Sequence, residues 1–235
     1  EGWTVAQVLL YLESQELLVK QVLTNDSSLW KTLGVDEPLA TLPEGLFFPD
    51  TYDYHLNDQP SNILLRAYKR LQFVLNEEWE AREAGLPYEN AYEALVMASI
   101  IEKETGVPEE RGQIAGVFVR RLRMGMRLQT DPTVSYGLGD VYKGDLRGSH
   151  LRDENNIYNT YKQQGLPPTP IALAGREAIH AALHPADGDA IFFVAKGDGT
   201  HAFSATLQEH EAAVKRYQLS QRKTNYRSAP PISEK

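Results

Sequence analysis

The sequence predicts an α+β protein that is mainly helical and carries one small β-hairpin. Apolar residues recur at helical spacing over most of the chain, whereas only two short runs, 190–195 and 201–204, have the character of strands. The five residues between these runs, KGDGT, are typical of a hairpin turn. With 235 residues, of which 42% are hydrophobic, the chain can bury a sizeable core.

The first quarter of the chain predicts one helix followed by shorter pieces. Thr4 opens an amphipathic helix whose apolar face extends to Leu18. Several prolines then interrupt residues 24–60, so we expect only short helices and loops there. We therefore predict an N-terminal subdomain of helices and loops over residues 1–60.

Three longer helices are predicted next, because the apolar stripe repeats with helical period and each stripe has start and stop signals. Ser61 caps a helix over 61–84, a second helix runs over 92–105, and a third begins at Pro108 and ends near Met124. Glycine or proline follows each of the first two helices closely, which is typical of helix ends.

The second half of the chain predicts less regular structure. Residues 126–170 are polar and rich in Gly, Pro, Asn, Tyr and Thr, and we expect mostly loop. Helices are expected over 171–183 and 206–217, on either side of the hairpin. Residues 61–219 would then form the main domain, and 220–235 a polar C-terminal tail.

Composition and charge narrow the functional class. The formal net charge of −8 argues against nucleic acid, or any partner bound through many phosphates. There is no Cys, so neither a disulfide framework nor a thiolate metal site is expected. No run approaches 18 apolar residues, so no membrane span is predicted. The chain begins at Glu1 without Met, and we expect any signal peptide or anchor to lie upstream.

No metal site, cofactor site or serine nucleophile is predicted. The six histidines form no HExxH pair, and no serine lies in a G-x-S-x-G motif. His180 and His184 are four residues apart, but no third ligand is evident near them and Pro185 follows at once. We therefore expect this histidine pair to have a role at a helix end.

The run ASIIEKETGVP, at 98–108, ends a very apolar helix with two carboxylates. At about 100° per residue, Glu104 falls in the middle of the apolar arc that contains Ile100, whereas Glu102 falls on the polar side next to Lys103. We therefore predict that Glu104 points toward the core or a cleft and that Glu102 points toward solvent.

This placement predicts a raised pKa for Glu104. Desolvation penalises the carboxylate, and the negative end of the helix dipole penalises it further. A glutamic acid that keeps its proton near neutral pH is what a general acid needs to protonate a glycosidic oxygen. The alternative is a buried structural glutamate that is ion-paired with Arg120, Arg121 or Arg127.

Two polar loops, at 126–136 and 155–168, carry side chains that suit sugar binding. Amides and hydroxyls can pair with sugar hydroxyls and N-acetyl groups, and aromatic rings can stack on pyranose faces. Either loop alone is typical of an ordinary surface loop. The presence of both loops together with a buried Glu favours a sugar-binding site. The candidate substrate-binding residues are Gln129, Thr130, Asp131, Tyr136, Tyr158, Asn159 and Tyr161.

These stretches carry a resemblance to a known family. The runs ASIIEKET at 98–105, RRLRMGMRLQTDPTV at 120–134 and YNTYKQQGLPP at 158–168 resemble the MltG (YceG-like) endolytic murein transglycosylases. The resemblance extends from Glu1 to about Leu219, and the middle run is highly specific. Shorter later matches, such as ALHPA, FVA and HAF, agree with it.

The resemblance implies a lytic enzyme of bacterial peptidoglycan, with glycan strands as substrate and cell-wall synthases as partners. Such enzymes cleave the β-1,4 bond between N-acetylmuramic acid and N-acetylglucosamine without water and leave a 1,6-anhydromuramoyl end. The family's catalytic acid is the second Glu of the E-K-E-T run, here Glu104, in a lysozyme-like placement beside Thr105. The resemblance also implies action at the periplasmic face of the inner membrane, through a single anchor and a LysM-like lobe expected upstream of Glu1.

Two alternatives stay open. A glycoside hydrolase would use Glu104 together with Asp131, because a hydrolase needs a second carboxylate about 5 to 9 Å away. A lytic enzyme needs only one carboxyl group, and Gln129, Thr130 and Asp131 would then shape the site or hold Glu104 in place. The other alternative is a non-catalytic glycan-binding or scaffold module.

Overall fold

The structure, a computed structural model, describes residues 1–220. The helices in this part are α1 (Val5–Ser14), α2 (Ser28–Leu33), α3 (Pro60–Glu80), α4 (Ala91–Glu104), α5 (Pro108–Arg123), α6 (Asp131–Leu138), α7 (Gly148–Arg152), α8 (Arg176–Leu183) and α9 (Leu207–Val214), with a 3-10 turn η1 (Gly139–Val141) and a π-helical segment η2 (Lys215–Ser220). The strands are β1 (Phe192–Ala195) and β2 (His201–Ser204). The α+β prediction is confirmed.

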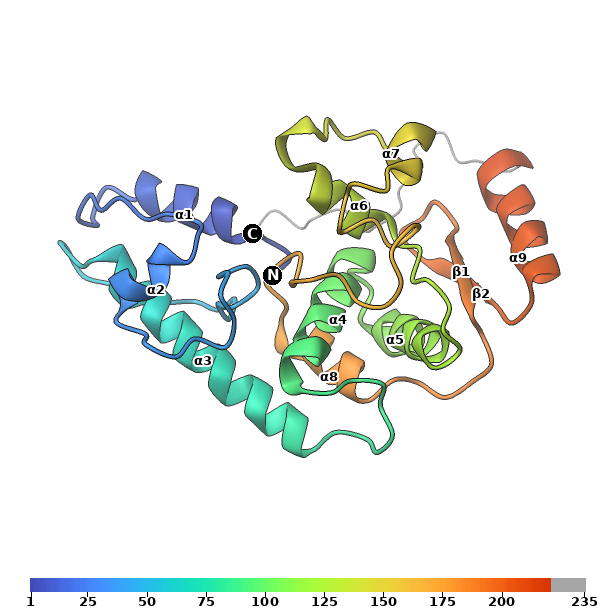
Figure 1. Cartoon of the computed structure of the whole chain (residues 1–235), viewed down its shortest axis with the longest axis horizontal. Helices are drawn as coiled ribbons and strands as arrows, with labels where there is room; N and C mark the ends of the chain where they lie inside the picture. The colour runs from blue at the N-terminus through green and yellow to red at the C-terminus, as the bar shows by residue number, and fades with distance from the viewer. Residues whose placement is uncertain (221–235) are drawn as a thin grey trace.

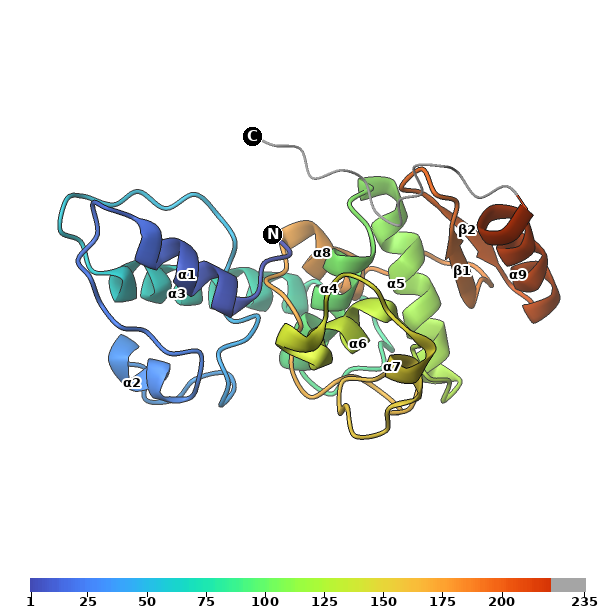
Figure 2. The same ribbon diagram turned by 90° about the horizontal axis from the view of Figure 1, so that it is seen from above.

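Helices α4, α5 and α8 lie at the centre of the molecule (Figures 1 and 2). Helices α1, α2 and the long α3 lie to one side of them, and the hairpin with α9 lies on the opposite side. Helices α6 and α7 lie along a third side, above α4 in Figure 1. The predicted boundary near residue 60, between an N-terminal subdomain and a main domain, stays a prediction.

Helix α4 is the central element of the core. Every residue from Ala94 to Ile101 is buried, so the helix is covered on all sides rather than along one stripe. The Asn90 side chain caps its start by accepting from the Glu93 amide. The helix ends at Glu104 because Thr105 is extended and Pro108 begins the next helix. Glu104 is thereby fixed at the C-terminal end of a rigid helix.

Helix α3 differs from its predicted span at both ends. Ser61 was predicted as the N-cap, but the helix begins at Pro60, and the capping position is Gln59, which makes no side-chain capping bond. Proline suits this first position because it has no amide hydrogen to satisfy. The helix ends at Glu80 rather than at residue 84.

Helix α8 begins later than predicted. Residues 171–175 are not helical, because partners distant in sequence bind their backbone. The Leu173 amide donates to the Trp3 carbonyl at 2.7 Å, and the Gly2 amide donates to the Leu173 carbonyl at 2.9 Å. The Ile171 amide donates to Ser99 Oγ at 3.0 Å. These bonds replace those that a helix would have formed.

The stretch 126–170 contains more helix than predicted. Helices α6 and α7 were expected to be loop, and the signals for α6 are short: an extended Thr130, an acidic first turn at Asp131 and Pro132 just inside the helix. Glycine at position 137 weakened the helical pattern of the sequence, although the helix needs it there. A Cβ on Gly137 would lie 2.0 Å from the Asn156 side chain.

The predicted hairpin is present and packs against α5. Its register pairs Phe193 with Phe203, and the Phe193 ring meets Phe118 of α5 edge-on at 5.6 Å. The buried Glu110 carboxylate accepts from the His201 amide at 2.8 Å and faces His201 Nδ1 at 2.8 Å. This contact fixes the hairpin to the first turn of α5.

The last helix is shorter than predicted. Helix α9 is capped by Thr206 through a capping box and gives way to η2 at Lys215. Apart from Ser220, the predicted polar tail 220–235 lies outside the described residues. Among the helices of residues 1–220, none is both long enough and apolar enough to cross a membrane.

Candidate active site

Glu104 is the last residue of α4 and is partly buried. The next residue, Thr105, is almost fully buried, and its hydroxyl accepts from the Val107 amide at 2.9 Å. This bond closes the turn that leads from α4 into α5. The backbone on both sides of Glu104 is therefore fixed, and only its side chain has freedom.

The Glu104 carboxylate accepts a hydrogen bond from the Thr130 hydroxyl. Burial raises the pKa of Glu104 to about 7, the Thr130 hydroxyl opposes the rise, and the nearby charge of Asp131 adds to it. The C-terminal position on α4 acts in the same direction as burial. Glu104 can therefore hold or release a proton near neutral pH, as the sequence predicted.

The ion-pair alternative for Glu104 does not hold in this structure. Among residues 1–220, no salt bridge includes Glu104. Arg121 donates to the carbonyls of Ile191 at 2.6 Å and Leu128 at 2.7 Å, and Arg120 donates to carbonyls as well. These guanidinium groups are used to hold loops, so they leave the carboxylate without a cationic partner.

A network of threonines holds Thr130 in place next to Glu104. The Thr130 amide donates to Thr160 Oγ1 at 3.0 Å, and the Thr133 hydroxyl donates to the Thr130 carbonyl at 2.8 Å. The hydroxyls of Thr133 and Thr160 lie 2.9 Å apart. All three threonines are buried, so the network joins the start of α6 to the loop around residue 160. Thr133 and Thr160 were not among the predicted site residues, although Thr160 lies inside the YNTY run.

Asp131 and Tyr161, both predicted site residues, are bonded to each other. The Tyr161 hydroxyl donates to Asp131 Oδ1 at 2.7 Å. Burial raises the pKa of Tyr161, and the charges of Asp131 and Glu104 raise it further. Asp131 is exposed, and its charge contributes to the raised pKa of Glu104. These three groups therefore form one electrostatic unit.

Gln129 precedes Thr130 and has a backbone φ of 55°, a conformation that residues other than glycine rarely adopt. Its amide donates to the Thr160 carbonyl at 3.2 Å, and its side-chain oxygen accepts from Arg121 Nη1 at 3.4 Å. The side chain is otherwise exposed. The strained backbone turns the chain from the end of α5 toward Glu104.

Tyr136 and Tyr158 form a second group of predicted site residues. Their rings meet edge-on at 4.8 Å. The Tyr136 hydroxyl donates to Glu44 Oε2 at 3.1 Å, and the Tyr158 hydroxyl lies 2.9 Å from Thr169 Oγ1. Both rings are partly buried. Glu44 had no signal in the sequence, because it lies 92 residues before Tyr136 in the chain.

Asn159 is not placed to contact a ligand, in contrast to its prediction as a substrate-binding residue. It is 0% exposed, and its amide nitrogen donates to the carbonyls of His150, Leu151 and Asp153. Its side-chain oxygen accepts from the Tyr161 amide at 3.1 Å. Asn159 therefore ties α7 to the loop that carries Tyr161.

The prediction that Glu102 points toward solvent is wrong. Glu102 is partly buried, and its Oε2 accepts from the Gly175 amide at 3.1 Å. Burial raises its pKa, although the Gly175 hydrogen bond opposes the rise. The reason is that the start of the chain covers this side of α4, where Lys103 Nζ donates to the Gly2 carbonyl at 3.0 Å.

Comparison with known proteins identifies the relatives of this fold and site. The YceG-like family matches residues 1–216. The chain is 38% identical over 174 residues to the endolytic murein transglycosylase of Bacillus subtilis, with 74% of this chain and 48% of that protein covered. It is 26% identical over 223 residues to the endolytic murein transglycosylase of Streptococcus pneumoniae, with 89% of this chain and 38% of that protein covered.

A solved structure agrees with these sequence matches. The crystal structure of a YceG-like protein from Listeria monocytogenes superposes with a TM-score of 0.67 at 30% identity, covering 90% of this chain and 73% of that one. The chain spans about half, or less, of the length of the two transglycosylases that it matches. Because the family match covers residues 1–216 and the fold agrees with that of a YceG-like protein, the chain belongs to the YceG-like family.

Proposed function

We propose that this chain is the catalytic part of an endolytic murein transglycosylase, a carbon–oxygen lyase, with Glu104 as its general acid and base. The substrate would be the β-1,4 bond between N-acetylmuramic acid and N-acetylglucosamine in peptidoglycan strands. Two relatives are named for this activity. The observation that carries the proposal is the Glu104 carboxyl, whose pKa is raised by burial to about 7 and which is bonded to a hydroxyl rather than to a cation.

One carboxyl group is enough for this reaction. The protonated Glu104 donates its proton to the glycosidic oxygen of N-acetylglucosamine as the bond from muramoyl C1 to that oxygen breaks. The resulting carboxylate then accepts the proton of the muramoyl 6-hydroxyl while that oxygen bonds to C1. No water is consumed, and Glu104 ends in its starting protonation state. A pKa near 7 suits both halves of this exchange.

The neighbours of Glu104 have roles that fit this chemistry. The Thr130 hydroxyl orients the carboxyl and stabilises the carboxylate after it has given up its proton. Gln129, Asp131, Tyr136, Tyr158 and Tyr161 remain proposed substrate contacts, and the partly buried tyrosines would offer ring edges and faces to pyranoses. No cofactor or metal is required for either proton transfer.

A two-carboxylate hydrolase is the second candidate, and the charge of Asp131 favours it. Asp131 is exposed and close enough to raise the pKa of Glu104. The Tyr161 hydroxyl, however, occupies Oδ1 of Asp131, and a donated hydrogen bond weakens a carboxylate as nucleophile or base. We therefore prefer the lytic mechanism, in which Asp131 tunes Glu104.

The products of the reaction distinguish the two candidates. Purified sacculi are digested with the chain, and the released fragments are analysed by mass spectrometry. The lytic reaction leaves 1,6-anhydromuramoyl ends, about 18 Da lighter than the reducing ends of hydrolysis, because no water is added. Reducing ends alone would contradict the lytic mechanism and support Asp131 as a second catalytic carboxylate.

Matched variants assign the catalytic residue. Glu104→Gln keeps the shape of the side chain but cannot donate a proton, so it should lose nearly all cleavage while its thermal unfolding stays cooperative. Glu102→Gln, two residues earlier on the same helix, should keep most of the activity. Full cleavage by Glu104→Gln would contradict Glu104 as the catalytic residue.

The site of action follows from the proposed substrate. Peptidoglycan lies outside the cytoplasmic membrane, so we propose that the protein acts there. Action at the inner membrane through an upstream anchor, and contact with cell-wall synthases, stay predictions of the family resemblance.

A further inference from the structure

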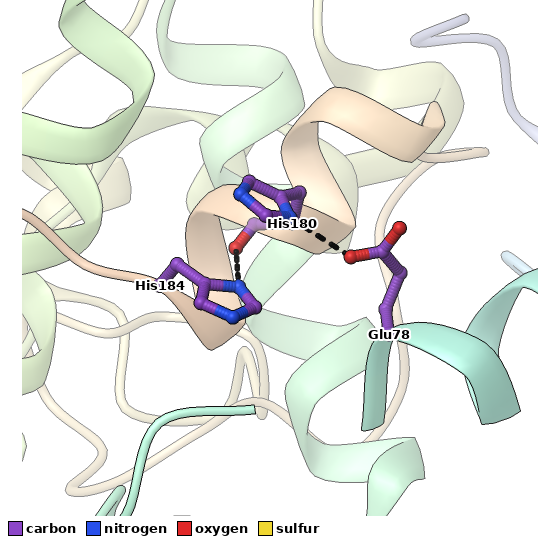
Figure 3. A group of neighbouring side chains, drawn as sticks. All are labelled: Glu78, His180 and His184. Atoms are coloured by element: carbon purple, nitrogen blue, oxygen red, sulfur yellow. Dashed lines mark hydrogen bonds and ion pairs between the residues drawn. The ribbon is translucent and has the colours of Figure 1, made fainter. Parts of the chain in front are cut away.

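Glu78, His180 and His184 form a cluster between α3 and α8 (Figure 3). Glu78 projects from α3 and His180 from α8, and His184 is the C-cap residue directly after α8. Glu78 Oε2 lies 2.9 Å from His180 Nδ1, and the two imidazole rings stack at 4.1 Å. One nitrogen or oxygen ligand atom from each residue lies within 4.8 Å of the others. No third ligand for this histidine pair is evident from the sequence, and the fold supplies one in Glu78.

The donor set suits a divalent transition metal. Two imidazoles and one carboxylate, with water at the remaining position, are a common ligand set of tetrahedral zinc. Imidazole favours zinc, copper and nickel over magnesium and calcium, which prefer oxygen donors. His180 has 54% of its side chain exposed, so a hydrated ion can reach the cluster.

Only small movements would complete the coordination. At zinc–ligand distances near 2.0 to 2.1 Å, tetrahedral donor atoms lie about 3.3 Å apart. The present separation of Glu78 Oε2 and His180 Nδ1 is already 2.9 Å. The widest separation, up to 4.8 Å, requires the third ligand to rotate by about 1.5 Å. Rotation of the exposed His180 side chain and the partly exposed His184 side chain is enough for such a shift.

The second shell around the cluster is oriented for metal binding. Arg176 Nη1 binds the other carboxylate oxygen, Glu78 Oε1, at 2.8 Å and leaves Oε2 directed at His180. This arrangement resembles the outer contacts that usually fix a ligating carboxylate. The guanidinium also repels a cation, which limits the affinity expected of the site.

In its neutral form, His184 has one ring nitrogen that could bind a metal ion. Its Nε2 lies 3.0 Å from the Ala81 carbonyl and its Nδ1 lies 3.2 Å from the His180 carbonyl. A neutral imidazole has a single N–H, so only one of these contacts can be a hydrogen bond. The other nitrogen presents a lone pair to a carbonyl oxygen, and turning it onto a metal ion removes that repulsion. The remaining N–H to a carbonyl is the usual second-shell bond of a metal-bound histidine.

We propose that Glu78, His180 and His184 bind one zinc-class divalent ion that bridges α3 and α8. The ion would fasten the C-terminal ends of these helices and so stabilise the surroundings of α4, without taking part in chemistry at Glu104. The proposal does not depend on the proposed function, because binding is measured without substrate.

Calorimetric titration of the 235-residue chain tests the proposal. The protein carries no histidine tag, is treated with chelator and dialysed, and is titrated with zinc chloride at pH 7.5. We expect saturable binding of one ion, no comparable binding of magnesium, and a melting temperature that rises with zinc concentration. Absence of saturable zinc binding would refute the site.

Variants show whether the bound ion occupies this cluster. His180→Ala and His184→Ala should each weaken zinc binding at least tenfold and abolish the zinc-dependent rise in melting temperature. His55→Ala changes an exposed histidine elsewhere and should bind zinc like the parent chain. Thermal unfolding without zinc shows whether each variant is folded. Because His180 is exposed, His180→Ala is the variant least expected to disturb the fold. Equal affinity in the His180→Ala and His184→Ala chains would also refute the site.

Discussion

At the scale of single residues, Glu104 and Thr130 form the pair on which the proposed chemistry depends. Burial makes the charged form of Glu104 costly, and the Thr130 hydroxyl recovers part of that cost by donating to the carboxylate. The pKa of about 7 is the balance of these effects with the repulsion from Asp131. Small changes around the pair should therefore shift the pKa of Glu104 without changing the fold.

The rate of cleavage should fall as pH rises through about 7. The pKa of Glu104 is raised to about 7, so the carboxyl is protonated below this pH and able to act as an acid, and it is ionised above it. Cleavage of sacculi, measured as released muropeptide between pH 5 and 9, should show this limb. A rate that is constant from pH 5 to 9 would contradict the assigned role.

The same pKa also affects stability, which provides a control that needs no substrate. The folded carboxyl holds its proton up to about pH 7, whereas the unfolded one releases it near the ordinary value of 4.5. Folded protein thus binds more protons in this window, so Glu104 lowers the free energy of unfolding as pH rises from 4.5 to 7. Relative to the parent chain, Glu104→Gln should therefore be more stable at pH 8 than at pH 4.

Thr130→Val should raise the pKa of Glu104 further, because it removes the hydroxyl that stabilises the carboxylate. The basic limb of the pH–rate profile should shift to higher pH, and the rate at pH 6 should fall because the carboxyl is less well oriented. Thr130→Ser keeps the donor and should retain the parent profile. An unshifted limb in the valine variant would show that the hydroxyl does not contact Glu104.

At the scale of elements, the site is assembled by the ends of helices. Glu104 ends α4, Thr130 directly precedes the start of α6, and the segment between α5 and α6 is fixed by Arg121. The Arg121 guanidinium donates to the carbonyls of Arg127 and Leu128 and to the Gln129 side chain. The left-handed backbone of Gln129 persists because these bonds hold it.

Arg121→Lys should destabilise the fold and lower activity, although it conserves charge. A lysine cannot reproduce the forked set of bonds, and buried hydrogen bonds from charged groups contribute about 1.5 to 3 kcal/mol each. We expect the free energy of unfolding to fall by about 2 kcal/mol in urea titrations, with a shift in the pH–rate limb as Thr130 moves.

Arg123→Lys on the same helix is the matched control. Arg123 is exposed and donates to the Gly85 carbonyl, so the change should stay within about 0.5 kcal/mol. Similar losses in both variants would show that the 127–129 segment does not depend on Arg121.

At the scale of the whole molecule, the early part of the chain is locked onto the later part at Glu44 and Gly45. The buried Glu44 carboxylate accepts from the Val5 amide at 3.0 Å and from the Tyr136 hydroxyl at 3.1 Å. Gly45 packs so closely on Pro170 that a Cβ would lie 2.3 Å from the proline ring. Segments more than 90 residues apart thereby meet around the tyrosines of the site.

Gly45→Ala should lower the free energy of unfolding by about 2 to 4 kcal/mol, because it combines overpacking against Pro170 with strain at a φ of +76°. Gly85→Ala is the control, since Gly85 has a similar φ of +73° and no atom within 4 Å of the added Cβ. It should cost about 1 kcal/mol. Urea titration measures both, and equal losses would mean that the Pro170 contact relaxes without cost.

Elements whose signals are local could be predicted from the sequence. The spans of α4, α5 and the hairpin follow from capping residues, proline, glycine and periodicity, and the structure reproduces them within about two residues. The inward direction of Glu104 and its raised pKa also follow from its position at the end of an apolar helix. The same helical-wheel argument failed for Glu102, because it describes the helix and not what covers it.

Features that depend on contacts between distant segments could not be predicted from the sequence. Residues 171–175 are not helical because Trp3 and Gly2 bind their backbone, and Asn159 is structural because carbonyls of α7 accept from its side-chain amide. Glu78 reaches the histidine pair from 102 residues away. Local pattern fixes which face of a helix is apolar, but the chain that covers a polar side chain, and so sets its charge and partners, is fixed only when the core packs.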